Sequence, residues 1–139
     1  MSVEYYPMSM ADYDEALALW QASEGVGLSQ ADSREAIARY LERNPGLSFA
    51  ARAGGELVGA VLAGHDGRRG FLHHLAVKPA YRRQGIGRAL TERCLAALRA
   101  EGIEKTHLFV YAENHAGRQF WRSLGWYERP ELVIMSKNL

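Results

Sequence analysis

The sequence holds one cysteine, Cys94, among its 139 residues. A lone cysteine excludes an internal disulfide and any zinc site built from several cysteines. The apolar runs are too short to cross a bilayer, and the first residues lack the basic and apolar segments of a secretion signal. We therefore expect a cytoplasmic protein without a membrane partner, in which Cys94 is a small buried hydrophobic residue.

Neither sign of charge is in clear excess, because the net charge is only +1. Residues 68–93 nevertheless contain seven basic residues and one acidic residue, whereas the rest contains ten basic and fifteen acidic residues. A basic segment in an otherwise acidic chain is typical of a focused anion site. Proteins that coat nucleic acid are normally basic over the whole domain, so we expect no nucleic-acid partner.

The length and the 47% share of hydrophobic residues fit one domain over residues 1–139. The apolar spacing predicts an α+β fold of order β-α-α-β-β-β-α-β-α-β, with helices on both faces of a mixed, mostly antiparallel sheet. The predicted strands cover residues 3–8, 47–53, 56–64, 70–78, 105–111 and, as one or two strands, 126–137. The first predicted helix follows a capping signal at Ser9 and Asp12, and the others cover residues 32–43, 87–100 and 114–124.

Residues 75–90 combine a short apolar strand, a turn with a proline, and a glycine loop that opens into a helix. Gly85 and Gly87 leave the backbone bare at the start of that helix, where N–H groups have no helical partner and the macrodipole is positive. Arg82, Arg83 and Arg88 surround the same place. The pattern indicates a phosphate site, most simply for the pyrophosphate of a cofactor. The alternative is a tight turn followed by an ordinary helix start.

Two segments together resemble the GNAT superfamily of N-acyltransferases. Residues 75–90 resemble its acyl-CoA-binding motif. The downstream motif of the family is matched by Asn114, Gly117, Phe120, Trp121, Leu124, Gly125 and Trp126. The predicted order of elements also resembles the family topology.

The resemblance implies that acetyl-CoA is the co-substrate. Backbone groups of Leu75 and Val77, with Ala76 between them, would pair with the pantetheine arm like an added strand. The implied pyrophosphate and 3′-phosphate site comprises Arg82, Arg83, Gln84, Gly85, Ile86, Gly87 and Arg88. Asn114, Phe120 and Trp121 would line the far side of the cofactor. The alternatives are that Asn114 only caps a helix and that Phe120 and Trp121 only fill a core.

Acetyl transfer requires a neutral amine and a way for the CoA thiolate to leave. Many members of the family have a tyrosine as general acid where this chain has Trp121. An indole N–H donates a hydrogen bond but releases no proton at working pH. The remaining candidates for the acid are Tyr111 and Tyr127, unless the thiolate leaves unassisted.

Several relatives have a glutamate base at the position of His73, and an imidazole can do the same work. Strand alternation places His74 on the opposite face, so at most one of the two histidines would enter the cleft. Another position where relatives have a glutamate base is occupied by Phe109. The alternative is that both histidines only make hydrogen bonds near the turn at Asp66.

In this family the first two helices and the loop between them largely select the acceptor. Trp20, Glu24 and Leu28 are the predicted acceptor contacts, although a loop carboxylate such as Glu24 is often only solvated. The resemblance implies an N-acetyltransferase that acts without a metal on a primary amine, in a small molecule or a peptide, through a direct ternary complex. The alternative is a catalytically silent acyl-CoA-binding regulator. A homodimer through the C-terminal strands is a further expectation from the family.

Overall fold

The structure, a computed structural model, describes residues 2–139. Contacts within the chain divide it into two compact units, Met1–Phe109 and Val110–Leu139. The expectation of one domain over residues 1–139 stays a prediction. None of the described helices has the length and apolar character needed to span a membrane.

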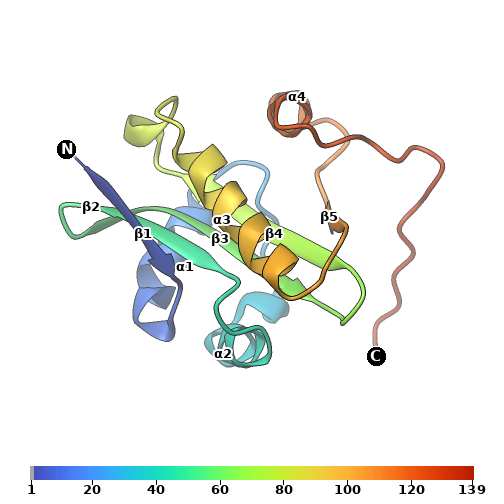
Figure 1. Cartoon of the computed structure of the whole chain (residues 1–139), viewed down its shortest axis with the longest axis horizontal. Coiled ribbons are helices and arrows are strands. Elements are labelled where there is room, and N and C mark those ends of the chain that lie inside the picture. Colours follow the sequence, from blue (N-terminus) through green and yellow to red (C-terminus); the bar gives the residue numbers. More distant parts are fainter. Residues whose placement is uncertain (1) are drawn as a thin grey trace. The chain divides into compact units, whose positions relative to one another are not determined.

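The first unit contains most of the regular structure (Figure 1). Its strands are β1 (Val3–Pro7), β2 (Phe49–Ala53), β3 (Glu56–His65), β4 (Gly70–Val77) and β5 (Thr106–Leu108). Its helices are α1 (Tyr13–Gln21), α2 (Arg34–Arg43) and α3 (Ile86–Ala100). Short 3-10 turns are η1 (Met10–Asp12), η2 (Gln30–Asp32) and η3 (Pro79–Tyr81). The mixed α+β fold class is therefore confirmed.

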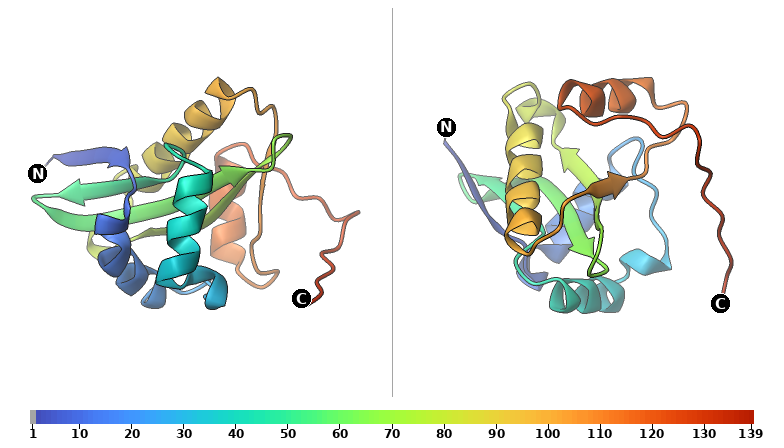
Figure 2. Two further views of the ribbon diagram at one scale, coloured as in Figure 1. Left: turned by 90° about the horizontal axis from the view of Figure 1, so that it is seen from below. Right: turned by 45° about the vertical axis from the view of Figure 1, so that its right-hand side comes forward.

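The sheet has the strand order β1-β2-β3-β4-β5. Its first four strands pair antiparallel, and β5 pairs parallel to β4. The β2–β3 hairpin turns at Gly54 and Gly55, both with the positive φ that this two-residue turn requires. Figure 2 shows α1 and α2 on one face of the sheet and α3 on the other.

The core follows the predicted helical stripes. Leu90, Cys94 and Leu98 of α3 are buried, as is Trp20 of α1. Burial raises the pKa of the Cys94 thiol to about 12, so the thiol stays protonated. Cys94 is thus the small buried hydrophobic residue that the sequence predicts.

A bulge in β4 changes which side chains share a face. Leu62 of β3 faces His73, but Ala60 faces Ala76, so β4 carries one extra residue between these pairs. His74 absorbs it with a left-handed backbone, φ 59°. Both imidazoles consequently lie on the face covered by α1 and α2, with ring centroids 6.2 Å apart. The prediction that His74 points to the opposite face is therefore wrong, because strict alternation holds only for an unbulged strand.

The second unit contains α4 (His115–Ser123). The Asn114 side chain caps it by accepting from the Gly117 N–H at 3.0 Å, and Gly125 follows its end with φ 94°. The strand predicted over residues 126–137 is not formed in the described chain. Pro130 has no N–H for a ladder, and the Leu132 N–H bonds back to the Arg129 carbonyl across a turn.

Candidate functional site

The edge of β4 becomes free partway along the strand. Pairing with β5 covers only Gly70, Phe71 and Leu72, and β5 ends at Leu108. From His73 to Val77, β4 has β3 on one side and no strand among the described residues on the other. Leu75, Ala76 and Val77 lie on this stretch, so its main-chain groups can pair with an extended ligand. The Val77 carbonyl already accepts a hydrogen bond from Arg82 Nε at 3.0 Å.

The free edge leads into the glycine loop. Arg83 and Gly85 have left-handed backbones, with φ of 63° and 80°, and together turn the chain into α3. The first helical bond runs from the Ala89 N–H to the Gly85 carbonyl, and no side chain caps the helix. The N–H groups of Ile86, Gly87 and Arg88 therefore point out of the first turn, which contains no acidic residue. Such a helix start attracts an anion.

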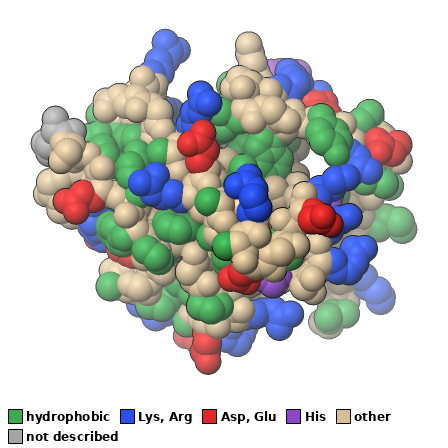
Figure 3. Space-filling model, viewed as in Figure 1, with side chains coloured by type: hydrophobic (Ala, Val, Ile, Leu, Met, Phe, Trp, Pro, Cys, Tyr) green, Lys and Arg blue, Asp and Glu red, His purple; other side chains and the backbone are tan. Residues whose placement is uncertain are grey.

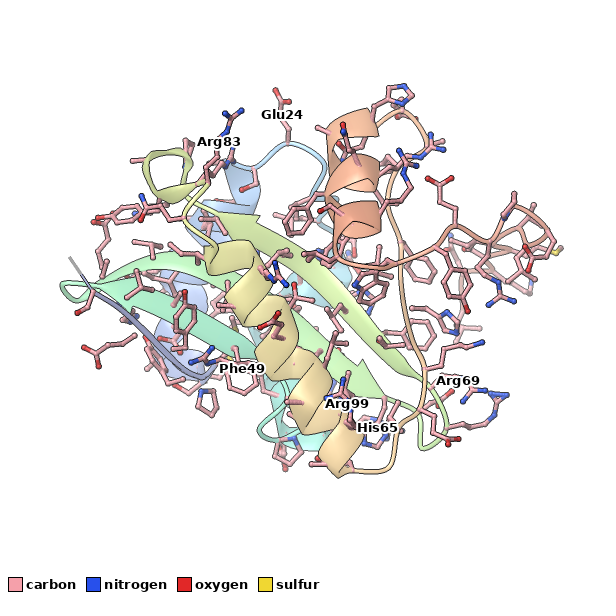
Figure 4. The ribbon with its side chains drawn as sticks, turned by 45° about the horizontal axis from the view of Figure 1, so that its top comes forward. Glu24, Phe49, His65, Arg69, Arg83 and Arg99 are labelled. Carbon is pink, nitrogen blue, oxygen red and sulfur yellow. The ribbon has the colours of Figure 1, made fainter. Side chains whose placement is uncertain are left out.

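The arginines around this loop differ in their contacts and in the direction of their side chains. Arg88 pairs with Glu92 one turn along α3 at 3.1 Å, an exposed contact. Arg83 extends outward at the end of the sheet where β4 ends, the same end as Glu24 (Figure 4). His65 and Arg69 mark the opposite end, at the β3–β4 hairpin. On the face in Figure 3, basic side chains of the described residues lie among acidic and hydrophobic ones.

The two imidazoles have different surroundings. His74 Nε2 lies 2.8 Å from Asp32 Oδ1, and the Trp20 ring packs on His74 at 5.3 Å between centroids. The His73 ring instead stacks parallel to Phe71 at 6.4 Å and meets the edge of Tyr40 at 6.3 Å. Burial, and next the neighbouring His74, lower the pKa of His73, so its neutral form prevails at pH 7.

A hollow of about 240 Å³ opens beside His73 on the α2 side of the sheet. It is lined by Tyr40, Arg43, Asn44, Gly64, His65, Asp66, Phe71 and His73. Backbone N–H groups of Arg69 and Arg68 lower the pKa of Asp66, which keeps it ionised at the rim. The Tyr40 hydroxyl is buried without a hydrogen bond to any described residue.

The predicted acceptor residues lie at different depths. Trp20 is 0% exposed, so its side chain offers no surface to a substrate and acts at most through His74. Leu28 is half-buried against the core, whereas Glu24 is exposed in the loop after α1. Phe109 lies beside His73, with ring centroids 6.2 Å apart.

The remaining predicted residues belong to the second unit. Tyr111 is 54% exposed. The Asn114 side-chain oxygen is engaged as the helix cap, which is the alternative role considered for it. Phe120 and Trp121 are half-buried and contact each other edge to face at 5.1 Å between centroids. Their roles toward a cofactor stay predictions.

Comparison with known proteins identifies the family. A model described as "Acetyltransferase (GNAT) family" matches residues 13–126. An acetyltransferase of Photorhabdus laumondii is 35% identical over 129 residues, which are 92% of this chain and 90% of the relative.

Solved structures agree with that assignment. The ribosomal-protein-S18-alanine N-acetyltransferase of Escherichia coli is 26% identical, with a TM-score of 0.76 over 92% of this chain and 79% of the other. The PaiA N-acetyltransferase of Thermoplasma acidophilum, solved with coenzyme A, shares the fold at 21% identity, with a TM-score of 0.77 and 89% of each chain covered.

These matches confirm the predicted enzyme class and the co-substrate, acetyl-CoA. They disfavour the silent regulator, because the relatives that match nearly the full chain are named acetyltransferases. The chain belongs to the GNAT family of acetyltransferases.

Proposed function

We propose that the protein transfers the acetyl group of acetyl-CoA directly to a primary amine, with both substrates bound at once. The observation that carries this proposal is the arrangement around β4. The strand has a free edge from His73 to Val77, an open helix start follows it, and two imidazoles lie on the face opposite α3. A donor on the edge and an acceptor on the imidazole face would reach the same stretch of strand.

On the donor side, main-chain groups at Leu75 and Val77 would hold the pantetheine arm. N–H groups from Arg83 through Arg88 would hold the pyrophosphate, because they lack helical partners. The Val77 carbonyl already accepts one bond from Arg82 and has a second lone pair for a ligand; if the ligand displaced Arg82, its guanidinium would be free for a phosphate.

On the acceptor side, the larger cost is the amine proton. An amine with a pKa near 10.4 lies about 3.4 units above neutral pH, so its deprotonation costs roughly 4–5 kcal/mol. A thiol near 8.5 is about 1.5 units away, or roughly 2 kcal/mol, so departure of the thiolate needs less help. An imidazole base therefore matters more than an acid. His73 stays the predicted base, His74 joins it as a second candidate, and Tyr111 stays the predicted acid.

The acceptor belongs to the primary amines, and both small molecules and peptides are candidates. The Escherichia coli relative is named for an alanine of a ribosomal protein, so a peptide that begins with alanine belongs among the tested acceptors. Glu24 is the accessible carboxylate that we expect to attract a cationic amine. A cytoplasmic location and a homodimer are part of the same proposal.

The donor site is tested by introducing a negative charge at the helix start. Gly85→Asp should weaken acetyl-CoA binding by more than about tenfold, or roughly 1.4 kcal/mol, because the carboxylate would repel the pyrophosphate. Gly67→Asp is the matched control, since both glycines have positive φ and no atom within 4 Å of an added Cβ. Isothermal titration calorimetry measures both dissociation constants. Equal affinities for acetyl-CoA would contradict the proposed site.

A further inference from the structure

We propose that His74, held by Asp32, is the group that takes the proton from the acceptor amine, and that Asp32 is its positioning residue. This inference rests on the proposed acetyl transfer and assigns the base within it. It departs from the sequence-based assignment to His73. His74 and Asp32 both belong to the first unit.

The first step is the bond between the two side chains. His74 Nε2 and Asp32 Oδ1 are 2.8 Å apart, and the side chains are 16% and 9% exposed. A carboxylate only accepts, so Nε2 carries the proton in the neutral ring and Nδ1 keeps its lone pair. In this tautomer Nδ1 is the ring nitrogen that can accept a proton. The pair thus has the arrangement in which a carboxylate orients an imidazole and stabilises the imidazolium that forms.

The second step is the way Asp32 is fixed. Its other oxygen, Oδ2, accepts the Ser29 N–H at 3.0 Å, which closes a capping box around η2. The Asp32 carbonyl accepts the Tyr13 hydroxyl at 2.6 Å. Both carboxylate oxygens and the main chain are therefore engaged, so the carboxylate cannot rotate away from His74 without breaking the box.

The third step is the backbone of His74. A left-handed conformation at a residue other than glycine costs about 1–2 kcal/mol, and such conformations cluster at functional sites. This bulge is what brings the His74 ring to the α1 face and opposite Asp32. It lies where β4 has lost its pairing with β5, next to the edge at Leu75 that would hold the donor.

The two imidazoles differ in their neighbours. His73 has aromatic neighbours and a pKa lowered by burial, so its imidazolium is disfavoured. The titratable groups facing His74 are Asp32 and His73. His74 alone has a carboxylate on the far nitrogen. We assign to His73 a place in the wall of the hollow beside α2 rather than a role as base.

His74 Nδ1 takes one proton from the acceptor ammonium, which leaves a neutral amine and an imidazolium. The amine nitrogen then forms a bond to the thioester carbon, the carbon–sulfur bond breaks, and CoA leaves as the thiolate. The second amine proton goes to solvent, and the imidazolium returns its own proton to solvent or to the thiolate.

The test compares substitutions that suit the backbone at residue 74. His74→Asn tolerates the left-handed conformation and cannot take a proton, although its shorter side chain also gives up the Nε2 bond to Asp32. We expect kcat to fall by about 100-fold or more with the affinity for acetyl-CoA unchanged. His73→Asn should lose less. His74→Gly relieves the backbone strain and should regain activity when imidazole is added, which a purely structural role would not allow.

The outcomes separate the two proposals. A larger loss in His73→Asn than in His74→Asn, or no response of His74→Gly to imidazole, overturns the assignment to His74 and leaves acetyl transfer intact. An unmodified protein that binds acetyl-CoA but acetylates no amine overturns the proposed function, and the base assignment with it. Urea unfolding of each variant shows that it is folded.

Discussion

Two Ser-x-Ala-Asp segments, at residues 9–12 and 29–32, fold in the same way and serve different partners. Each forms a 3-10 turn closed by a capping box, with the aspartate Oδ2 accepting the serine N–H at 3.0 Å. In the first, Asp12 Oδ1 accepts from Arg52 at 2.9 Å. In the second, Asp32 Oδ1 meets His74 at 2.8 Å. The capping box thus fixes the aspartate in both segments, and the side chain that meets Oδ1 determines the role of each segment.

The aspartate of the first capping box binds Arg52, a side chain that stays charged. Arg52 also binds Glu15 at 2.7 Å and contacts the Tyr6 hydroxyl, and these partners raise its pKa, so it never loses its proton at working pH. The second box holds a ring that can gain and lose a proton. The first network therefore joins β2 to the α1 layer for stability, whereas the second lies where chemistry is proposed.

The largest effect should come from removing the cation of the first box. Arg52→Met leaves the Asp12 carboxylate buried without its cation, which should lower the free energy of unfolding by about 3 kcal/mol or more. Arg34→Met is the control, because its pair with Asp14 is exposed and worth about 1 kcal/mol or less. Urea denaturation measures both. Similar small losses in the two variants would remove the structural role of the first box.

Neutralising each aspartate should separate rate from stability. Asp32→Asn should lower kcat by about tenfold to 100-fold, or roughly 1.4–2.7 kcal/mol, because His74 loses the charge that stabilises its imidazolium. Asp12→Asn should lose stability but retain kcat. Steady-state rates of CoA release at saturating substrates measure the difference. Equal rates in the two variants would contradict the claim that only the second capping box affects catalysis.

The serines allow a finer comparison. Ser9→Ala and Ser29→Ala each remove a hydroxyl that accepts a backbone N–H, which should cost about 0.5–1 kcal/mol of stability in both. Only Ser29→Ala loosens the box around Asp32, so only that variant should also lose rate. Thermal unfolding and CoA release, measured side by side, check this. A rate loss in Ser9→Ala would count against a special role for the second box.

Acid should lower the free energy of unfolding through His73, the imidazole next to His74. The pKa of His73 is lowered below its ordinary 6.5 by burial, so the unfolded chain binds that proton more readily than the folded one. Stability is then highest above pH 6.5 and falls as the pH drops from 6.5 toward the lowered value. His73→Asn should flatten that slope. Urea midpoints across this range test it, and an unchanged slope would assign the acid sensitivity to other groups.

Most elements of the first unit could be predicted from the sequence, because local signals there agree with the packing. The Ser9–Asp12 signal and the glycine pair at 54 and 55 occur where expected. The second capping box carried the same signal, Ser29 followed three residues later by Asp32, and the same rule would have found it.

The bulge at His74 has no comparable mark. Only glycine usually signals a left-handed residue inside a strand, and alternation then misassigns every later side chain. The strand predicted over residues 126–137 does not form among the described residues for another reason. Residues 132–135 have strand-forming side chains, but a strand also needs a partner, which a local pattern cannot supply. Trp20 shows a third limit, because aromatic residues at helical spacing suit both a core and a substrate surface.

The most direct test of the account follows CoA release from acetyl-CoA by the purified protein, continuously, against amines, amino acids, polyamines and an alanine-ended peptide. Hydrolysis without acceptor sets the baseline, and calorimetry confirms that acetyl-CoA binds. The account predicts that one class of primary amine raises the rate well above this baseline and appears as its N-acetyl product. A protein that binds acetyl-CoA yet releases CoA at the baseline rate with every amine would contradict it.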